Sequence, residues 1–187
     1  MARKVADMMW DMLASAGVKR CYGIVGDALN PVIDALRRNG KIEFIHVRHE
    51  EYGVFAAVAD AYFTGRPVAV CGTAGPGVTH LFNGLIDATK EGAPVIAIAG
   101  DVERSLIDTA ALEELNPYKF FDTASLYVGR IVDPDQALGS HCDSHNDCDT
   151  QEGFDGDLLA GRCRGDRCAV RRLCSCGTCY PRASSCG

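Results

Sequence analysis

The stretch IEFIHVRHEEYGVFAAVADAYFT, residues 42–64, contains the pattern that decides the fold. Residues 42–47 are a short apolar run typical of a strand, and the alanine-rich segment at 50–64 is typical of a helix. Glu50 and Glu51 therefore fall in the first turn of a helix that follows a strand. Acidic residues are common there because they favour the helix dipole, but a carboxylate at this position can also meet a ligand.

Similar alternation continues on both sides of this stretch. Strands are predicted at 21–26, 42–47, 67–73, 95–99 and 126–132, and helices at 4–16, 31–38, 50–64, 78–91 and 110–115. A further helix should begin at Pro134, but its pattern ends at Leu138-Gly139. Continuous apolar strands alternating with helices predict an α/β fold with a doubly wound parallel sheet.

Composition changes near residue 139. Residues 1–139 contain two cysteines, whereas residues 140–187 contain eight, with Arg but no Lys and few aliphatic side chains. We therefore predict an incomplete α/β domain at 1–139 and a Cys-rich, disordered tail at 140–187. The tail could bind zinc through Cys176-x-x-Cys179, could form disulfides, or could be an off-frame product of a GC-rich gene, which its composition favours.

Charge and hydropathy argue against several classes of protein. The net charge of −6 is spread without a block of one sign, which argues against a nucleic-acid or membrane-surface partner. The 187 residues contain no apolar run of membrane-spanning length, and the first residues lack the apolar core of a secretory signal. The sequence therefore predicts a cytoplasmic protein without a membrane span.

The loops after the predicted strands are the candidates for chemistry, since the carboxyl ends of parallel strands share one edge where ligands bind. These loops are residues 25–27, 49–50, 72–77 and 100–101. In the third loop, Gly75 and Gly77 would allow close approach of a flat ligand, and Pro76 would stiffen the turn. This loop matches neither the P-loop nor the G-x-G-x-x-G fingerprint.

Four segments together resemble a known family: GVKRCYGIVGDALN (17–30), RHEE (48–51), GTAGPGVTHLFNGL (72–85) and PVIAIA (94–99). They are similar to the amino-terminal pyrimidine-binding (PYR) domain of thiamine diphosphate-dependent enzymes, over about residues 3–137. Within that superfamily the segments most resemble pyruvate oxidase and pyruvate:quinone dehydrogenase, followed by acetolactate synthase.

The resemblance assigns roles to individual residues. Glu50 matches the catalytic glutamate that hydrogen-bonds N1′ of the cofactor's aminopyrimidine and so helps to activate thiazolium C2. The remaining cofactor-binding positions match the turn and loop that pack on the pyrimidine: Val25, Gly26, Thr73, Pro76, Gly77 and His80. No metal ligand is expected. Structural or supporting roles are expected for Cys21, His46, His49 and Cys71. Glu51 is expected to be a solvated or helix-start residue, and Asp101, which stands where several relatives have Gln, is given little weight.

The resemblance also implies what this chain lacks. Family members hold the diphosphate and Mg²⁺ through a Gly-Asp-Gly…Asn domain, and the oxidase branch binds FAD in a middle domain; neither segment is found here. We expect the pyrimidine half of a homo-oligomeric enzyme that oxidises or decarboxylates a 2-oxo acid such as pyruvate, inactive alone. The alternatives are a split enzyme completed by a diphosphate domain in trans, and a non-catalytic interaction module with a metal-binding Cys-rich tail.

Overall fold

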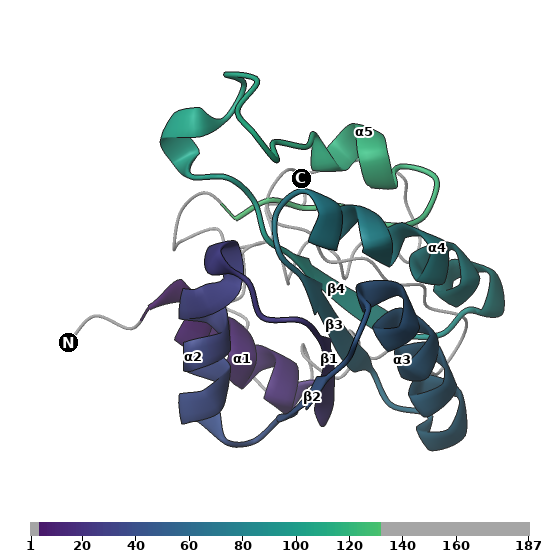
Figure 1. Cartoon of the computed structure of the whole chain (residues 1–187). Coiled ribbons are helices and arrows are strands. Elements are labelled where there is room, and N and C mark those ends of the chain that lie inside the picture. Colours follow the sequence, from purple (N-terminus) through teal and green to yellow (C-terminus); the bar gives the residue numbers. More distant parts are fainter. Residues whose placement is uncertain (1–3, 132–187) are drawn as a thin grey trace, which may run out of the picture.

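The fold is built around one parallel sheet (Figure 1). The computed structural model describes residues 4–131, so the predicted domain end at residue 139 and the tail at 140–187 lie outside the described residues. The sheet has the order β2-β1-β3-β4, with all neighbouring strands parallel. The strands are β1 (Arg20–Gly23), β2 (Glu43–His46), β3 (Val68–Gly72) and β4 (Val95–Ala99).

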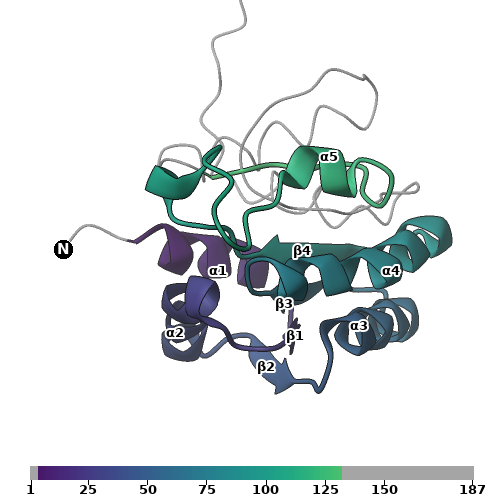
Figure 2. The ribbon, with the colours of Figure 1, turned by 45° about the horizontal axis from the view of Figure 1, so that its top comes forward.

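Helices cover both faces of the sheet, which confirms the doubly wound prediction. Helices α1 and α2 lie on one face and α3 and α4 on the other, with α5 above α4 in Figure 2. The helices are α1 (Val5–Ser15), α2 (Asn30–Asn39), α3 (Glu50–Thr64), α4 (Pro76–Glu91) and α5 (Pro117–Phe121), with 3-10 turns η1 (Asp27–Leu29) and η2 (Arg104–Leu106). None of these helices of the described chain is long and apolar enough to cross a bilayer.

The two faces of β3 explain its unbroken apolar sequence. Val68 and Val70 belong to the core beneath α3 and α4, whereas Ala69 and Cys71 belong to the core beneath α1 and α2. All of these side chains are buried. A strand covered on both faces needs apolar residues at every position, because neither side meets water.

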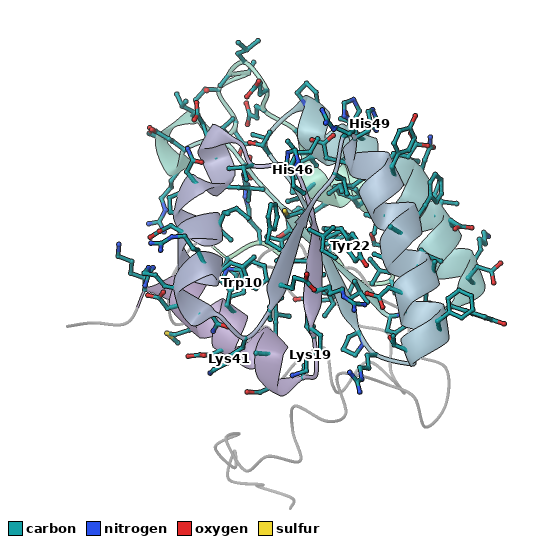
Figure 3. All side chains as sticks on the ribbon, turned by 60° about the horizontal axis from the view of Figure 1, so that its bottom comes forward. Trp10, Lys19, Tyr22, Lys41, His46 and His49 are labelled. Carbon is teal, nitrogen blue, oxygen red and sulfur yellow. The ribbon has the colours of Figure 1, made fainter. Side chains whose placement is uncertain are left out.

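The strand order places a topological switch between β1 and β3. The chain runs from β1 outward to β2, and then returns to form β3 on the other side of β1. Ligands of such sheets bind outside the carboxyl ends of the strands at this switch. Figure 3 shows His46 and His49 at this carboxyl end, opposite Lys19 and Lys41.

The predicted helix at 110–115 is wrong. Asp108, Ala110 and Glu113 have positive φ values of 62°, 58° and 70°, which no right-handed helix permits. The Glu114 carboxylate instead accepts hydrogen bonds from the backbone N–H groups of Asp108 and Ala111 and holds this segment as a compact loop.

A helix forms slightly later, at α5. The Asn116 side chain accepts a hydrogen bond from the backbone N–H of Lys119 at 3.1 Å, and Pro117 occupies the first helical position. Asn followed by Pro is a strong helix-start signal. The cap therefore determines where this helix begins.

The described part of the predicted fifth strand, residues 126–131, is not in a strand. Side chains fix this part of the chain instead of backbone pairing with β4. Thr89 donates a hydrogen bond to the carbonyl of Ala124 at 2.7 Å, and Arg130 pairs with Asp101. Val128 packs against the core under α3 and α4. These contacts take the place of the backbone hydrogen bonds with β4 that the apolar pattern predicted.

Asp60 connects α3 to β1, and its loss should destabilise the fold. Its carboxylate lies 2.9 Å from Arg20 Nη1 and accepts a hydrogen bond from the Tyr22 hydroxyl at 3.1 Å. Burial, with the Asp60 carboxylate beside it, raises the pKa of Tyr22. We expect Asp60→Asn to lower the free energy of unfolding by about 1.5–3 kcal/mol, the usual contribution of hydrogen bonds to a charged group. Urea denaturation followed by circular dichroism measures this.

Glu43→Gln is the matched control. Glu43 also contacts Arg20, but at 3.4 Å and with its side chain 67% exposed. Exposed ion pairs contribute little, so this change should stay within about 0.5 kcal/mol. Equal effects of the two substitutions would show that Asp60 has no special role.

Candidate functional site

Glu50 is the one buried charged side chain in the described part of the chain, only 6% exposed. His49, with extended backbone at φ −155° and ψ 137°, precedes α3, and Glu50 is its first residue. Helix α3 therefore starts where β2 has ended, at the carboxyl edge of the sheet. A buried carboxylate is costly unless it is hydrogen-bonded or paired, so its neighbours decide its role.

His80 is the partner of Glu50. Its Nδ1 lies 2.9 Å from Glu50 Oε2, and its own side chain is 41% exposed. The second carboxylate oxygen faces Gly77, where an added Cβ would lie 3.2 Å from Glu50 Oε1. The carboxylate is thus held by α4 on one side, while His80 leaves the pair accessible from solvent.

His49 also belongs to this site, although the sequence assigned it only a supporting role in its loop. Its ring stacks on that of His80, with centroids 4.3 Å apart and planes at 29°. Its Nδ1 is buried and has no hydrogen-bond partner among the described residues. In the sequence, the adjacency of His49 to Glu50 was the signal that His49 could belong to the same site. Only the fold brings His80 against both residues.

The loops after β1 and β3 meet beside Glu50, at the topological switch. A Cβ on Gly26 would lie 2.5 Å from Thr73 Oγ1, and one on Gly77 would lie 3.0 Å from Thr73 Cγ2. Gly75 has φ 67° and approaches the side chain of Glu113. The chain's own packing therefore requires these glycines, in addition to any requirement of a ligand.

Most of the predicted site residues come together, and two lie at the margin. The contacts above connect Gly26 to Thr73, Thr73 to Gly77, Gly77 to Glu50 and Glu50 to His80. Two other predicted residues are exposed, namely Val25 and Pro76. Asp101, which the sequence weighted little, pairs with Arg130 instead.

Glu51 faces a different environment from Glu50. Its Oε1 accepts a hydrogen bond from Asn83 Nδ2 at 3.1 Å, in an exposed setting. Asn83 lies one turn beyond His80 on α4, so the two acidic residues in the first turn of α3 each meet α4. Only Glu50 is buried, which distinguishes the two carboxylates.

The cysteines of the sheet are buried, as predicted. Cys21 and Cys71 are fully buried on neighbouring strands and are not in a disulfide. A hydrogen bond with Cys71, together with burial, raises the pKa of the Cys21 thiol. A buried thiol of this kind is a poor nucleophile and a good core side chain.

Comparison with known protein families gives a match over most of the described residues. Residues 3–120 match the family model described as "Thiamine pyrophosphate enzyme, N-terminal TPP binding domain". The chain belongs to this family. The match includes every residue of the Glu50 site, from Gly26 to His80.

Curated relatives of this TPP-binding domain are longer proteins. An uncharacterized 42.6 kDa protein of Pseudomonas amyloderamosa is 45% identical over 136 residues, which are 73% of this chain and 34% of the relative. Pyruvate oxidase of Lactiplantibacillus plantarum is 44% identical over 107 residues, 56% of this chain and 18% of the relative. Chloroplastic acetolactate synthase of Arabidopsis thaliana is 39% identical over 112 residues, 60% of this chain and 17% of the relative. The chain thus spans about a third of the first relative and less than a fifth of the two named enzymes.

The Glu50 site fits the pyrimidine ring of thiamine pyrophosphate. A ring nitrogen that carries a proton can donate it to a carboxylate, and Glu50 is a buried carboxylate held in place by His80. The unpartnered Nδ1 of His49 adds a polar atom that the fold leaves unsatisfied. A diphosphate with a bound Mg²⁺ would instead need several oxygen ligands, and the Glu50 site offers one carboxylate beside two imidazoles.

Proposed function

We propose that this chain supplies the pyrimidine-binding half of a thiamine pyrophosphate site in an enzyme that converts a 2-oxo acid. The observation that carries the proposal is the burial of Glu50 in the first turn of α3, against His80, at the carboxyl edge of the sheet. Similarity to a pyruvate oxidase and to an acetolactate synthase supports a 2-oxo acid as substrate. The pyruvate oxidase and pyruvate:quinone dehydrogenase branch is our more specific proposal.

Each residue of the site has a task in this proposal. The carboxyl group of Glu50 holds or releases a proton at N1′ of the aminopyrimidine, because its burial leaves few competing partners. His80 orients that carboxyl group through its hydrogen bond. Gly26, Thr73 and Gly77 form the backbone surface beside it. When bound, the cofactor would supply the electron sink for decarboxylation.

The remaining parts of such an enzyme lie outside the described domain. Mg²⁺ and, in the oxidase branch, FAD would be held by domains other than this one, either in a longer protein or in a separate chain acting in trans. Helix α3 exposes large aromatic side chains that suit a protein contact: Tyr52, Phe55, Tyr62 and Phe63. A homo-oligomer and a cytoplasmic location stay predictions.

The deciding experiment replaces Glu50 by glutamine in an assembly completed with the missing domains, and measures activation of the bound cofactor. A loss of activation supports the proposal. Unchanged activation would leave the alternative of a non-catalytic interaction module.

The chain alone should bind thiamine pyrophosphate weakly. Charge-assisted contacts to the diphosphate are strong, and the Glu50 site contributes none of them. We expect a dissociation constant no better than about 1 mM, which corresponds to about −4 kcal/mol. Isothermal titration calorimetry of the full chain with Mg²⁺ present measures it. Micromolar binding would show that the described domain, or the tail, holds more of the cofactor than its pyrimidine.

A further inference from the structure

We propose that His49, Glu50 and His80 form a binding site for a divalent transition-metal cation such as Zn²⁺. Each of these side chains offers one ligand atom, and the three atoms lie within 4.8 Å of one another. Two of the residues are adjacent at the start of α3, and the third comes from the first turns of α4. The helices therefore assemble the donors from segments about 30 positions apart in the chain.

The donor set suits a borderline metal. Two imidazoles and one carboxylate are the protein ligands of several zinc sites, which keep a further position open. Imidazole also favours cobalt, nickel and copper, whereas Mg²⁺ prefers oxygen ligands. Tetrahedral zinc, with bonds of about 2.0–2.2 Å, needs ligand atoms about 3.3 Å apart. Rotation of the His49 and His80 rings out of their stack would bring the three ligand atoms, now within 4.8 Å, to that spacing.

Independent features of the site favour a cation. Glu50 is a charged side chain with only 6% exposure, and buried charges are paired or bind metals. The hydrogen bond to His80 satisfies one of its oxygens but leaves the buried Nδ1 of His49 without a partner among the described residues. A bound ion is one of the recognised explanations for such an atom.

Access to the site is open from one direction. The His80 side chain is 41% exposed, so a hydrated cation can reach it without unfolding the domain. His80 and Glu50 now share a hydrogen bond at 2.9 Å, and a cation would replace the proton between them. The stacked rings of His49 and His80, with centroids 4.3 Å apart, already present their edges to a common neighbour.

One consequence rests on the proposed function, whereas metal binding itself does not. A cation that ligates Glu50 occupies the carboxylate that would otherwise meet the pyrimidine. Transition-metal ions would therefore compete with thiamine pyrophosphate for this domain and inhibit the completed enzyme.

Co²⁺ is the probe of choice, because its visible absorption reports coordination by nitrogen and oxygen, and thiolate ligation adds a separate near-ultraviolet band. The full chain is titrated with Co²⁺ with Cys176 and Cys179 changed to serine, since this pair has metal-ligand spacing. We expect a nitrogen- and oxygen-ligated species. Its affinity should fall more than about 100-fold in His80→Gln and in His49→Gln, beyond the 10–100-fold cost of losing an outer-shell partner.

His46→Gln is the matched control, since His46 is an exposed histidine at the end of β2 near the same edge. It should leave Co²⁺ affinity unchanged. Melting curves of each variant without metal identify loss of folding, and Zn²⁺ should raise the melting temperature of the parent and the control only. Equal Co²⁺ affinity in the parent, His49→Gln and His80→Gln overturns the site, as does binding through thiolates alone.

The outcomes separate this inference from the proposed function. Co²⁺ binding at the three residues, combined with unimpaired cofactor activation in Glu50→Gln, keeps the metal site and rejects the function. Impaired cofactor activation in Glu50→Gln, combined with no Co²⁺ binding at the three residues, keeps the function and rejects the metal site.

Discussion

Glu50→Gln should slow hydrogen–deuterium exchange at C2 of bound thiamine pyrophosphate by about 10²–10⁴-fold, the usual contribution of a general acid–base group. Glutamine has nearly the same shape and can keep a hydrogen bond to His80, which lies 2.9 Å from the carboxylate. It cannot hold or release a proton at N1′ as a carboxyl group does. The experiment uses the chain completed with its missing domains, and exchange is followed by NMR.

Glu51→Gln is the control for this substitution. Glu51 sits one residue further along α3, and its Oε1 accepts a hydrogen bond from Asn83 in an exposed setting. A glutamine can accept the same bond, so exchange at C2 should remain close to that of the parent. A larger effect of Glu51→Gln than of Glu50→Gln would show that Glu51, and not Glu50, activates the cofactor. No effect from either would reject the proposed function.

Trp10→Ala should produce the largest loss of stability, about 3–5 kcal/mol, as truncation of a buried aromatic residue usually does. Trp10 is fully buried between α1 and the neighbouring core, and its Nε1 donates a hydrogen bond to the carbonyl of Val32 at 2.8 Å. The substitution removes this bond and opens a cavity on the α1 and α2 side of the sheet (Figure 3). Chemical denaturation followed by circular dichroism measures this loss. Tryptophan fluorescence cannot follow it, because Trp10 is the only tryptophan of the chain.

Two further variants test this interpretation. Trp10→Phe retains much of the packing and loses the hydrogen bond, so its effect should be clearly smaller than that of Trp10→Ala. Tyr62→Ala truncates an aromatic residue that is 76% exposed and should stay within about 0.5 kcal/mol. A loss below about 1 kcal/mol for Trp10→Ala would show that α1 contributes little to the core.

Local patterns in the sequence were sufficient for the main elements of the sheet. The apolar run through Val68 and Cys71 predicts a strand buried on both faces, and the structure buries it between two helix layers. Glycines at the ends of α2, α3 and α4 adopt the left-handed conformation that the helix-stop signals imply. Glu50 was likewise placed in the first turn of its helix by sequence alone. These features depend on neighbours within a few residues, so they are readable from the chain.

Features that depend on particular side-chain contacts were not readable in this way. The segment at 110–115 looked helical, but the Glu114 carboxylate satisfies backbone N–H groups that a helix would have used differently. The apolar run at 126–131 looked like a strand, but side chains such as Thr89 and Asp101 hold this region instead. Local side-chain to backbone hydrogen bonds displaced the helix at 110–115, and tertiary contacts displaced the strand at 126–131.

The sequence by itself determined the parallel α/β domain, its membership in the thiamine pyrophosphate family and the placing of Glu50 at a helix start. Only the tertiary structure decided that Glu50 is buried against His80, that His49 stacks on the same ring, and that Gly26 and Gly77 close on Thr73. The physical reason is distance along the chain. The start of a helix is set by its own first turn, whereas burial and pairing arise only when α3 and α4 pack together on the sheet.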